Sequence, residues 1–111
     1  MNNKNEVSSL SVDDVRQLGR LAFQGLGLTA SNAEQVANLL VMADLFGLTT
    51  HGLSRIESYG ERLESGGISA SAVPNVKALA PAISQVDGQN AVGPLVGMAA
   101  LEAGMSIAKQ Y

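Results

Sequence analysis

The organisation of the chain follows from one stretch, LFGLTTHGLSRIESYGERL at residues 45–63. It contains His51, the only histidine of the sequence, and two arginines that follow it closely. Thr49 and Thr50 precede a run of apolar residues at helical spacing, where a hydroxyl can cap the first free N–H groups of a helix. The stretch therefore predicts a helix that begins at about His51.

The two faces of that helix would differ in chemistry. At about 100° per residue, one sector of about 80° carries four polar or aromatic side chains, those of His51, Arg55, Tyr59 and Arg62. The adjoining sector carries an apolar stripe of Leu53, Ile56, Gly60 and Leu63. We expect the stripe to be buried and the first sector to be exposed.

The exposed sector suits a small organic anion. Arginine matches a carboxylate with two parallel hydrogen bonds, and histidine can give or take a proton near neutral pH. A carbonyl acid needs both an anchor for its carboxylate and a proton for its oxygen. The alternative is structural, because a lone histidine at a helix start often caps or packs and spaced arginines often lie on a solvated face. The spacing alone leaves both interpretations open.

The composition narrows the class of protein. The chain has 111 residues, 46% of them apolar and 15% charged, which suits one modest globular domain. The net charge is −3 and no basic run occurs, so we expect neither nucleic acid nor a membrane surface as a partner. The sequence has no cysteine and one histidine, so no metal site is expected. No segment resembles a signal peptide or a membrane span, which predicts a cytoplasmic location.

Two helices are predicted before the central stretch. Ser11 and Asp14 open the first, and the glycines of 25–27 end it. The second begins with an S-x-x-E capping box, Ser31 to Glu34. Its expected buried stripe consists of Val36, Leu39, Leu40, Ala43 and Phe46.

Asp44 lies near the end of the second predicted helix, where the helix dipole disfavours an acid. Such a placement suggests a partner, and the sequence offers Arg55 or His51. An ordinary surface acid is the alternative.

The pattern changes after Pro74. Segments 76–80 and 83–87 are predicted strands, followed by a turn at Asp87-Gly88 and a helix over about 95–109 with Pro94 in its first turn. That helix is apolar around most of its circumference, which is typical of a buried helix. Two strands make a poor sheet alone. We therefore expect this segment to open a second domain.

The predicted fold is mainly α, with an N-terminal three-helix domain followed by the first strands and helix of a truncated α/β sheet domain. The expected divisions are a flexible N-terminus at 1–10, a helical domain at 11–74 and an incomplete sheet domain at 75–111.

The central motifs resemble the malate/L-lactate dehydrogenase family of NAD(P)-dependent oxidoreductases, which is distinct from the Rossmann-fold lactate dehydrogenases. The resemblance covers about residues 10–111 and corresponds to the N-terminal portion of the family. The matching positions are Ala43-Asp44-Leu45, Gly47, Thr50-His51-Gly52, Arg55, Tyr59, Arg62-Leu63, Gly66, Val86-Asp87-Gly88 and Gly93. Thr50 stands where the family has serine, which keeps the hydroxyl and adds a methyl group. Thr49 stands where many members have aspartate.

The resemblance implies roles for several residues. His51 would be the catalytic proton donor or acceptor, and Thr50, Arg55 and Tyr59 would bind the substrate. The reaction would be hydride transfer between NAD or NADP and a 2-hydroxy or 2-oxo acid. The cofactor site would lie mostly beyond residue 111.

Two functions follow as hypotheses. In the first, the chain is an N-terminal fragment of a homodimeric 2-hydroxy acid dehydrogenase and is inactive alone. In the second, it is a non-catalytic helical module that binds a protein partner through its last helix.

Overall fold

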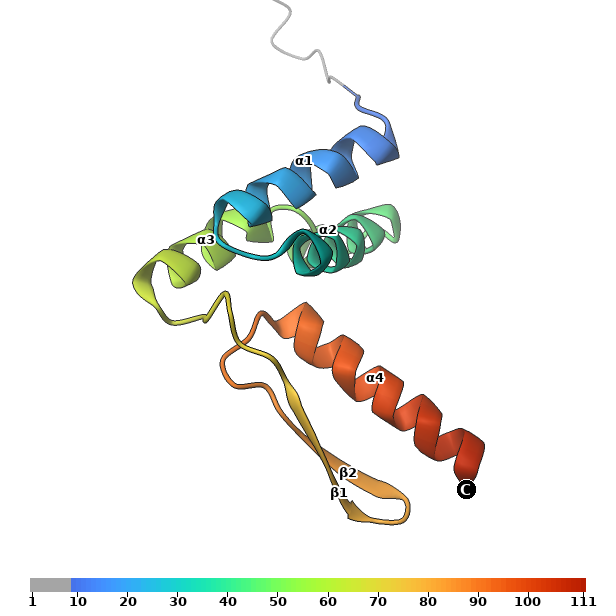
Figure 1. Ribbon diagram of the computed structural model, residues 1–111. Helices are drawn as coiled ribbons and strands as arrows, with labels where there is room; N and C mark the ends of the chain where they lie inside the picture. The colour runs from blue at the N-terminus through green and yellow to red at the C-terminus, as the bar shows by residue number, and fades with distance from the viewer. Residues whose placement is uncertain (1–8) are drawn as a thin grey trace, which may run out of the picture.

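The computed structural model describes residues 9–111 and is mainly α, which confirms the predicted fold class (Figure 1). Residues 1–8 of the predicted flexible N-terminus lie outside the described residues. The elements, in chain order, are α1 (Val12–Gly25), α2 (Ala30–Leu45), the 3₁₀ turn η1 (Thr49–His51), α3 (Arg55–Ser65), β1 (Asn75–Ala80), β2 (Ile83–Asp87) and α4 (Gly93–Gln110).

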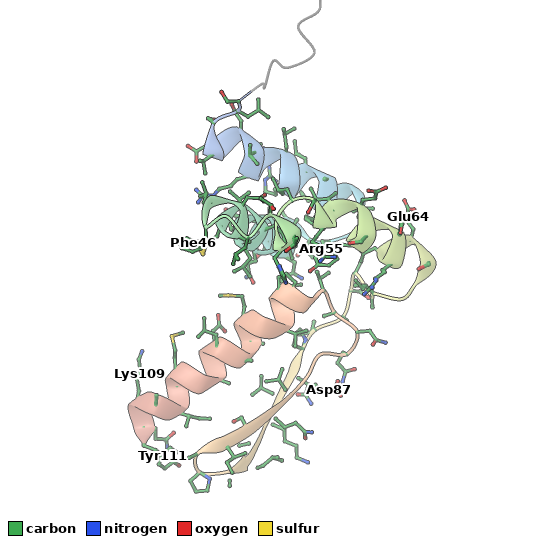
Figure 2. The ribbon with its side chains drawn as sticks, turned by 180° about the vertical axis from the view of Figure 1, so that it is seen from behind. Phe46, Arg55, Glu64, Asp87, Lys109 and Tyr111 are labelled. Atoms are coloured by element: carbon green, nitrogen blue, oxygen red, sulfur yellow. The ribbon has the colours of Figure 1, made fainter. Side chains whose placement is uncertain are left out.

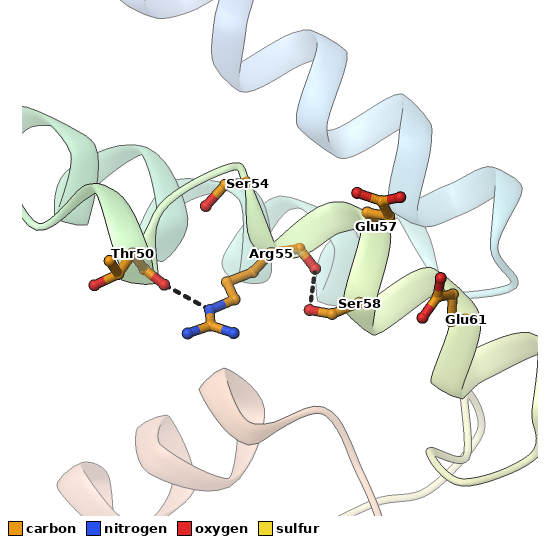
Figure 3. Close-up of a pocket in the computed structure, with 6 residues that line it drawn as sticks. All are labelled: Thr50, Ser54, Arg55, Glu57, Ser58 and Glu61. Atoms are coloured by element: carbon orange, nitrogen blue, oxygen red, sulfur yellow. Dashed lines mark hydrogen bonds between the residues drawn. The ribbon is translucent and has the colours of Figure 1, made fainter.

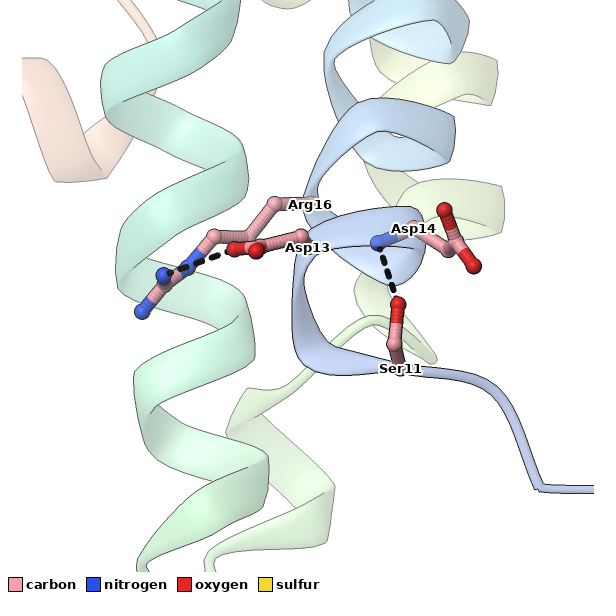
Figure 4. Close-up of polar contacts among 4 residues, drawn as sticks. All are labelled: Ser11, Asp13, Asp14 and Arg16. Atoms are coloured by element: carbon pink, nitrogen blue, oxygen red, sulfur yellow. Dashed lines mark hydrogen bonds and ion pairs between the residues drawn. The ribbon is translucent and has the colours of Figure 1, made fainter.

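The first helix begins as predicted. The backbone N–H of Asp14 donates to the hydroxyl of Ser11 over 3.1 Å, which caps α1 (Figure 4). Asp13, in the first turn of α1, forms a surface ion pair at 3.7 Å with Arg16, three residues later. The helix ends at Gly25, and Gly27 then takes a φ of 105°, a conformation that glycine adopts without strain.

The predicted capping box of the second helix is wrong. The cap is Thr29, whose hydroxyl accepts from the N–H of Asn32 over 3.2 Å, and Ser31 lies inside the helix. The residue before this cap, Leu28, is buried in the core. The core therefore fixes the chain at Leu28, and the helix begins directly after it, with a cap two residues before the predicted one. The local S-x-x-E pattern carries no information about that tertiary contact.

Replacement of Thr29 by alanine is expected to lower the free energy of unfolding by about 1 kcal/mol, because the hydrogen bond to Asn32 is lost. Ser31→Ala is the matched control and should change stability little, since Ser31 is exposed within the helix. Urea denaturation of both variants measures the difference. A larger loss of stability in Ser31→Ala than in Thr29→Ala would show that Ser31 caps the helix, as the S-x-x-E pattern predicts.

The helical core lies where α1, α2, α3 and the start of α4 meet. Its buried cluster consists of Phe23, Leu28, Ala33, Val36, Leu40, Val92 and Leu95. Phe46 was predicted to belong to the buried stripe but is 76% exposed. Phe46 is the C-cap of α2 and its N–H still donates to the Met42 carbonyl over 3.0 Å, but no described element covers its side chain at this edge of the helical layer (Figure 2).

The hairpin confirms both predicted strands. β1 and β2 pair antiparallel, with Val76 opposite Val86, and the register shifts between Ala78 and Ala80. The hairpin and α4 extend together away from the helical layer (Figure 1). Every residue of β1 is exposed.

A tight turn leads from β2 into α4. Ala91 N–H donates to the Gly88 carbonyl over 2.8 Å, and Gln89 and Asn90 both have positive φ. The Asp87 carboxylate accepts from the Gln89 N–H over 3.0 Å, which supports the turn predicted at Asp87-Gly88.

The last helix is longer than predicted, from Gly93 to Gln110, and Pro94 lies in its first turn. Within residues 9–111 its one buried side chain is Leu95, and Leu101 and Met105 are about half exposed. The helix is therefore apolar without being covered. None of the described helices combines the length and apolarity needed to cross a membrane.

Candidate functional site

The structure places His51 in the 3₁₀ turn η1 and not on α3, so the predicted helix is present but its predicted start at about His51 is wrong. The His51 N–H donates to the Leu48 carbonyl over 2.9 Å, and the Gly52 N–H donates to the Thr49 carbonyl over 3.3 Å. Both bonds span three residues, as in a 3₁₀ turn. Gly52 is extended (φ −93°, ψ −154°), and α3 begins three residues later at Arg55.

The helix is interrupted because Asp44 of α2 takes its hydrogen bond. In a continuous helix the Leu53 N–H would donate to the Thr49 carbonyl. It donates instead to the Asp44 carboxylate over 2.9 Å, while the Ser54 hydroxyl donates to Thr49. The sequence offered Arg55 or His51 as a partner of Asp44, with an unpaired surface acid as the alternative. The structure shows neither, because the partner is the Leu53 backbone amide.

Thr50 contacts both of the groups predicted to act on a substrate. Its hydroxyl lies 2.9 Å from Nδ1 of His51. Its carbonyl accepts from Nε of Arg55 over 2.5 Å (Figure 3). All three residues are exposed. The contact at Nδ1 leaves Nε2 of the imidazole, and the contact at Nε leaves the two terminal nitrogens of the guanidinium, to face solvent or a ligand.

A shallow, open depression of about 440 Å³ lies beside these groups. Its lining residues are Thr50, Ser54, Arg55, Glu57, Ser58 and Glu61 (Figure 3). The Arg55 side chain extends away from the two carboxylates, so an anion would meet the guanidinium at one end of the depression (Figure 3). The sequence reasoning missed the four other residues, although Ser54, Ser58 and Glu61 lie on one helical face by their i, i+4, i+7 spacing.

Tyr59 is not brought into this depression. Its ring packs against Phe23 of the core, with centroids 6.4 Å apart and planes tilted by 49°, and it is half-buried. The predicted apolar stripe does face the core, since Leu53, Ile56 and Leu63 pack there and Gly60 is buried. Tyr59 therefore lies on the border of that stripe. A role of Tyr59 in substrate binding stays a prediction.

The one cationic group among the described residues of the depression, the Arg55 guanidinium, could bind a single carboxylate. The depression offers one guanidinium and two carboxylates, whereas a pyrophosphate requires several backbone N–H groups or cations. Among residues 9–111, no three acidic, histidine or cysteine side chains come together as a metal site.

The sequence and the fold both match known dehydrogenases. Residues 10–111 match the family model described as malate/L-lactate dehydrogenase. Malate dehydrogenase from Pyrococcus horikoshii is 33% identical over 84 residues, 76% of this chain and 23% of that protein. Ureidoglycolate dehydrogenase (NAD(+)) from Escherichia coli K12 is 31% identical over 101 residues, 91% of this chain and 29% of that protein.

Solved structures show the same arrangement. The structure of malate dehydrogenase from Pyrococcus horikoshii OT3 aligns with a TM-score of 0.86 and 28% identity, over 99% of this chain and 33% of that one. Sulfolactate dehydrogenase from Methanocaldococcus jannaschii aligns with a TM-score of 0.80 and 30% identity, over 90% and 29%. The chain spans about a quarter to a third of the length of these relatives. It belongs to the malate/L-lactate dehydrogenase family.

Proposed function

We propose that this chain supplies the substrate-binding, proton-transferring part of an NAD(P)-dependent oxidoreductase that interconverts 2-hydroxy acids and 2-oxo acids. One observation carries the proposal. Thr50 holds the His51 imidazole with its hydroxyl and the Arg55 guanidinium with its carbonyl, so a proton-transferring group and a carboxylate anchor are fixed by a single residue.

The two groups have complementary tasks in this reaction. The free guanidinium nitrogens of Arg55 would bind the substrate carboxylate. If Nδ1–H donates to the Thr50 hydroxyl oxygen, Nε2 faces the substrate, and the imidazolium would protonate the 2-oxo oxygen from Nε2 and become the neutral Nδ1–H tautomer. In the opposite direction Nε2 would accept the proton of the 2-hydroxyl group. The nicotinamide, when bound, supplies or accepts the hydride at the substrate carbon.

The remaining parts of the proposal concern the longer protein. The chain covers about a quarter to a third of its relatives' length, and one of these is named as NAD(+)-dependent. We therefore place most of the nicotinamide site outside residues 1–111. Residues 11–74 would form the substrate side and residues 75–111 the start of a nicotinamide-binding sheet domain. The longer protein would be a cytoplasmic homodimer.

The direct test is an assay with NADH or NADPH and a panel of 2-oxo acids. The 111-residue chain alone should show no turnover, whereas a longer protein that contains it should reduce at least one 2-oxo acid. Turnover by the chain alone would show that its site is complete. A folded longer protein without activity on any 2-oxo acid would contradict the proposed reaction.

Arg55→Lys tests the anchor. Lysine keeps the charge but loses the planar fork and the Nε bond to Thr50, so KM for the 2-oxo acid should rise about 10–100-fold. kcat should fall less than KM rises, because the imidazole is retained. Glu64→Gln, at the far end of α3, is the charge-altering control and should leave both constants unchanged (Figure 2). An unchanged KM in Arg55→Lys would remove Arg55 from the carboxylate site.

A helical interaction module is the second candidate, and the exposure of α4 favours it. Leu101 is 52% exposed and Met105 48% exposed on an otherwise apolar helix. Under this alternative, polar substitutions at Met98 and Leu101 would weaken association with a partner, and His51→Ala would change little. Under the dehydrogenase proposal His51→Ala would strongly lower the activity, and the polar substitutions at Met98 and Leu101 would change it little.

A further inference from the structure

The segment that carries His51 and Arg55 is shaped mainly by its own hydrogen bonds. The His51 N–H donates to Leu48, the Ser54 hydroxyl donates to Thr49, and the Arg55 N–H donates to Gly52 over 3.0 Å. All of these bonds join residues no more than five positions apart. They give the turn its shape, but they do not fix it relative to the helical layer.

Asp44 adds a side-chain attachment to α2, beside the backbone bond from the Leu48 N–H to the Ala43 carbonyl over 2.8 Å. Its bond to the Leu53 N–H spans nine positions and is, among residues 9–111, the one side-chain hydrogen bond between this segment and α2. Leu53 lies two residues after His51 and two before Arg55. A fixed point at Leu53 therefore constrains both groups through only two residues of chain on either side.

The surroundings of the bond are closely packed. Gly52 is buried although its neighbour His51 is exposed, and a Cβ at Gly52 would overlap the Asp44 carboxylate. The Leu53 side chain is held from the other side, since a Cβ at Gly19 of α1 would lie 3.2 Å from its Cδ2. Leu53 is thus fixed by α2 through its amide and by α1 through its side chain.

Asp44 occupies a position that does not favour an acid for the helix itself. It lies in the last turn of α2, near the negative end of the helix dipole. A hydrogen bond from a backbone amide to a carboxylate is stronger than one to a neutral acceptor, and here it offsets the unfavourable placement. The placement is explained if the carboxylate stabilises the turn that carries His51 and not α2.

We propose that Asp44 is a positioning residue that holds the His51 turn against α2, and that it acts on catalysis only through His51 and Arg55. This inference rests on the function proposed above. It predicts that a displaced turn loses rate through misorientation of the imidazole, an effect that reaches about 100-fold for a shift on the order of 1 Å.

The test compares Asp44→Ala with Asp44→Asn. The asparagine side-chain carbonyl can still accept from Leu53, whereas alanine cannot. Glu64→Ala is the matched control, because Glu64 is an exposed acid in the last turn of α3 and its removal relieves the same dipole conflict.

The first measurement is amide hydrogen exchange and ¹⁵N relaxation on the 111-residue chain. Exchange at Leu53 should become at least about tenfold faster in Asp44→Ala, with lower order parameters across 49–53, and both should stay near wild type in Asp44→Asn and Glu64→Ala. Unchanged exchange at Leu53 in Asp44→Ala, with the chain folded, would overturn the inference.

The second measurement is kinetics in a longer, active protein that contains the chain. Measured where every variant is fully folded, Asp44→Ala should lower kcat by about 10–100-fold, and Asp44→Asn should restore it to within about threefold. An active protein in which Asp44→Ala keeps its kcat would contradict the positioning role and leave the proposed function intact. Faster exchange at Leu53 without any 2-oxo acid activity would contradict the proposed function and leave the attachment intact.

Discussion

Replacing His51 with alanine is expected to lower kcat for 2-oxo acid reduction by about 10²–10⁴-fold in a longer, active protein, since that is the range contributed by a positioned proton donor. KM should change little, because Arg55 keeps its bond to the Thr50 carbonyl. The melting temperature should be unchanged, since the imidazole is exposed and contacts only the Thr50 hydroxyl by a hydrogen bond among the described residues. Steady-state kinetics and a thermal melt check both statements.

Thr50→Val separates the two contacts that Thr50 makes. Valine keeps the carbonyl that holds Arg55 but loses the hydroxyl that faces Nδ1. We expect kcat to fall by less than in His51→Ala, with KM near wild type, because the imidazole remains but its tautomer and orientation are no longer fixed.

A His51→Ala variant that retains kcat to within tenfold would assign the proton transfer to another group.

The features predicted from sequence are those with local causes. Ser11 caps α1 through a bond to an amide three residues away, the glycines of 25–27 end α1, and the two strands lie on either side of a short turn. Each of these depends on neighbouring residues alone, so periodicity and turn chemistry suffice.

The features that sequence reasoning missed have nonlocal causes. Thr29 displaced the expected capping box because Leu28 is fixed by the core. His51 left the predicted helix because Asp44, nine residues before Leu53, takes the amide that the helix would have used. A helical wheel assumes an unbroken helix and carries no information on such a competing acceptor.

The candidate site was therefore predicted in part. Thr50 and Arg55 meet at one depression and His51 adjoins them, but the wheel grouped His51 with Arg55 for the wrong reason, and Thr50 was named only through the family resemblance. Their proximity comes from the Thr50 hydroxyl and carbonyl, not from a shared helical face. Tyr59, which does lie on α3, turns to the core instead.

Replacing Gly52 with alanine is expected to lower the free energy of unfolding by about 3 kcal/mol, the sum of an overpacking term and a lost hydrogen bond. The backbone angles of Gly52 are open to any residue, so strain in φ and ψ is not the cause. The cause is the added Cβ, which would overlap the Asp44 carboxylate and force it away from the Leu53 N–H.

Gly97→Ala is the matched control, because a Cβ at Gly97 of α4 meets no atom within 4 Å. It should stabilise the chain by about 0.5–1 kcal/mol through helix propensity. Urea denaturation of both variants, with equal m values, gives the change in the free energy of unfolding at a glycine with space for a Cβ and at one without. Equal small effects at both glycines would show that Asp44 can move aside freely.

A double-mutant cycle with Asp44→Ala isolates the contact itself. Once the carboxylate is removed, the Cβ at position 52 has room and the hydrogen bond is already lost, so Gly52→Ala should cost less than about 1 kcal/mol in that background. The coupling energy would then be about 2 kcal/mol. Additive costs would mean that the Cβ is opposed by other atoms and that Asp44 is not the residue against which the turn is packed. A strong coupling would identify one carboxylate as both the reason that position 52 must be glycine and the reason that His51 lies outside a helix.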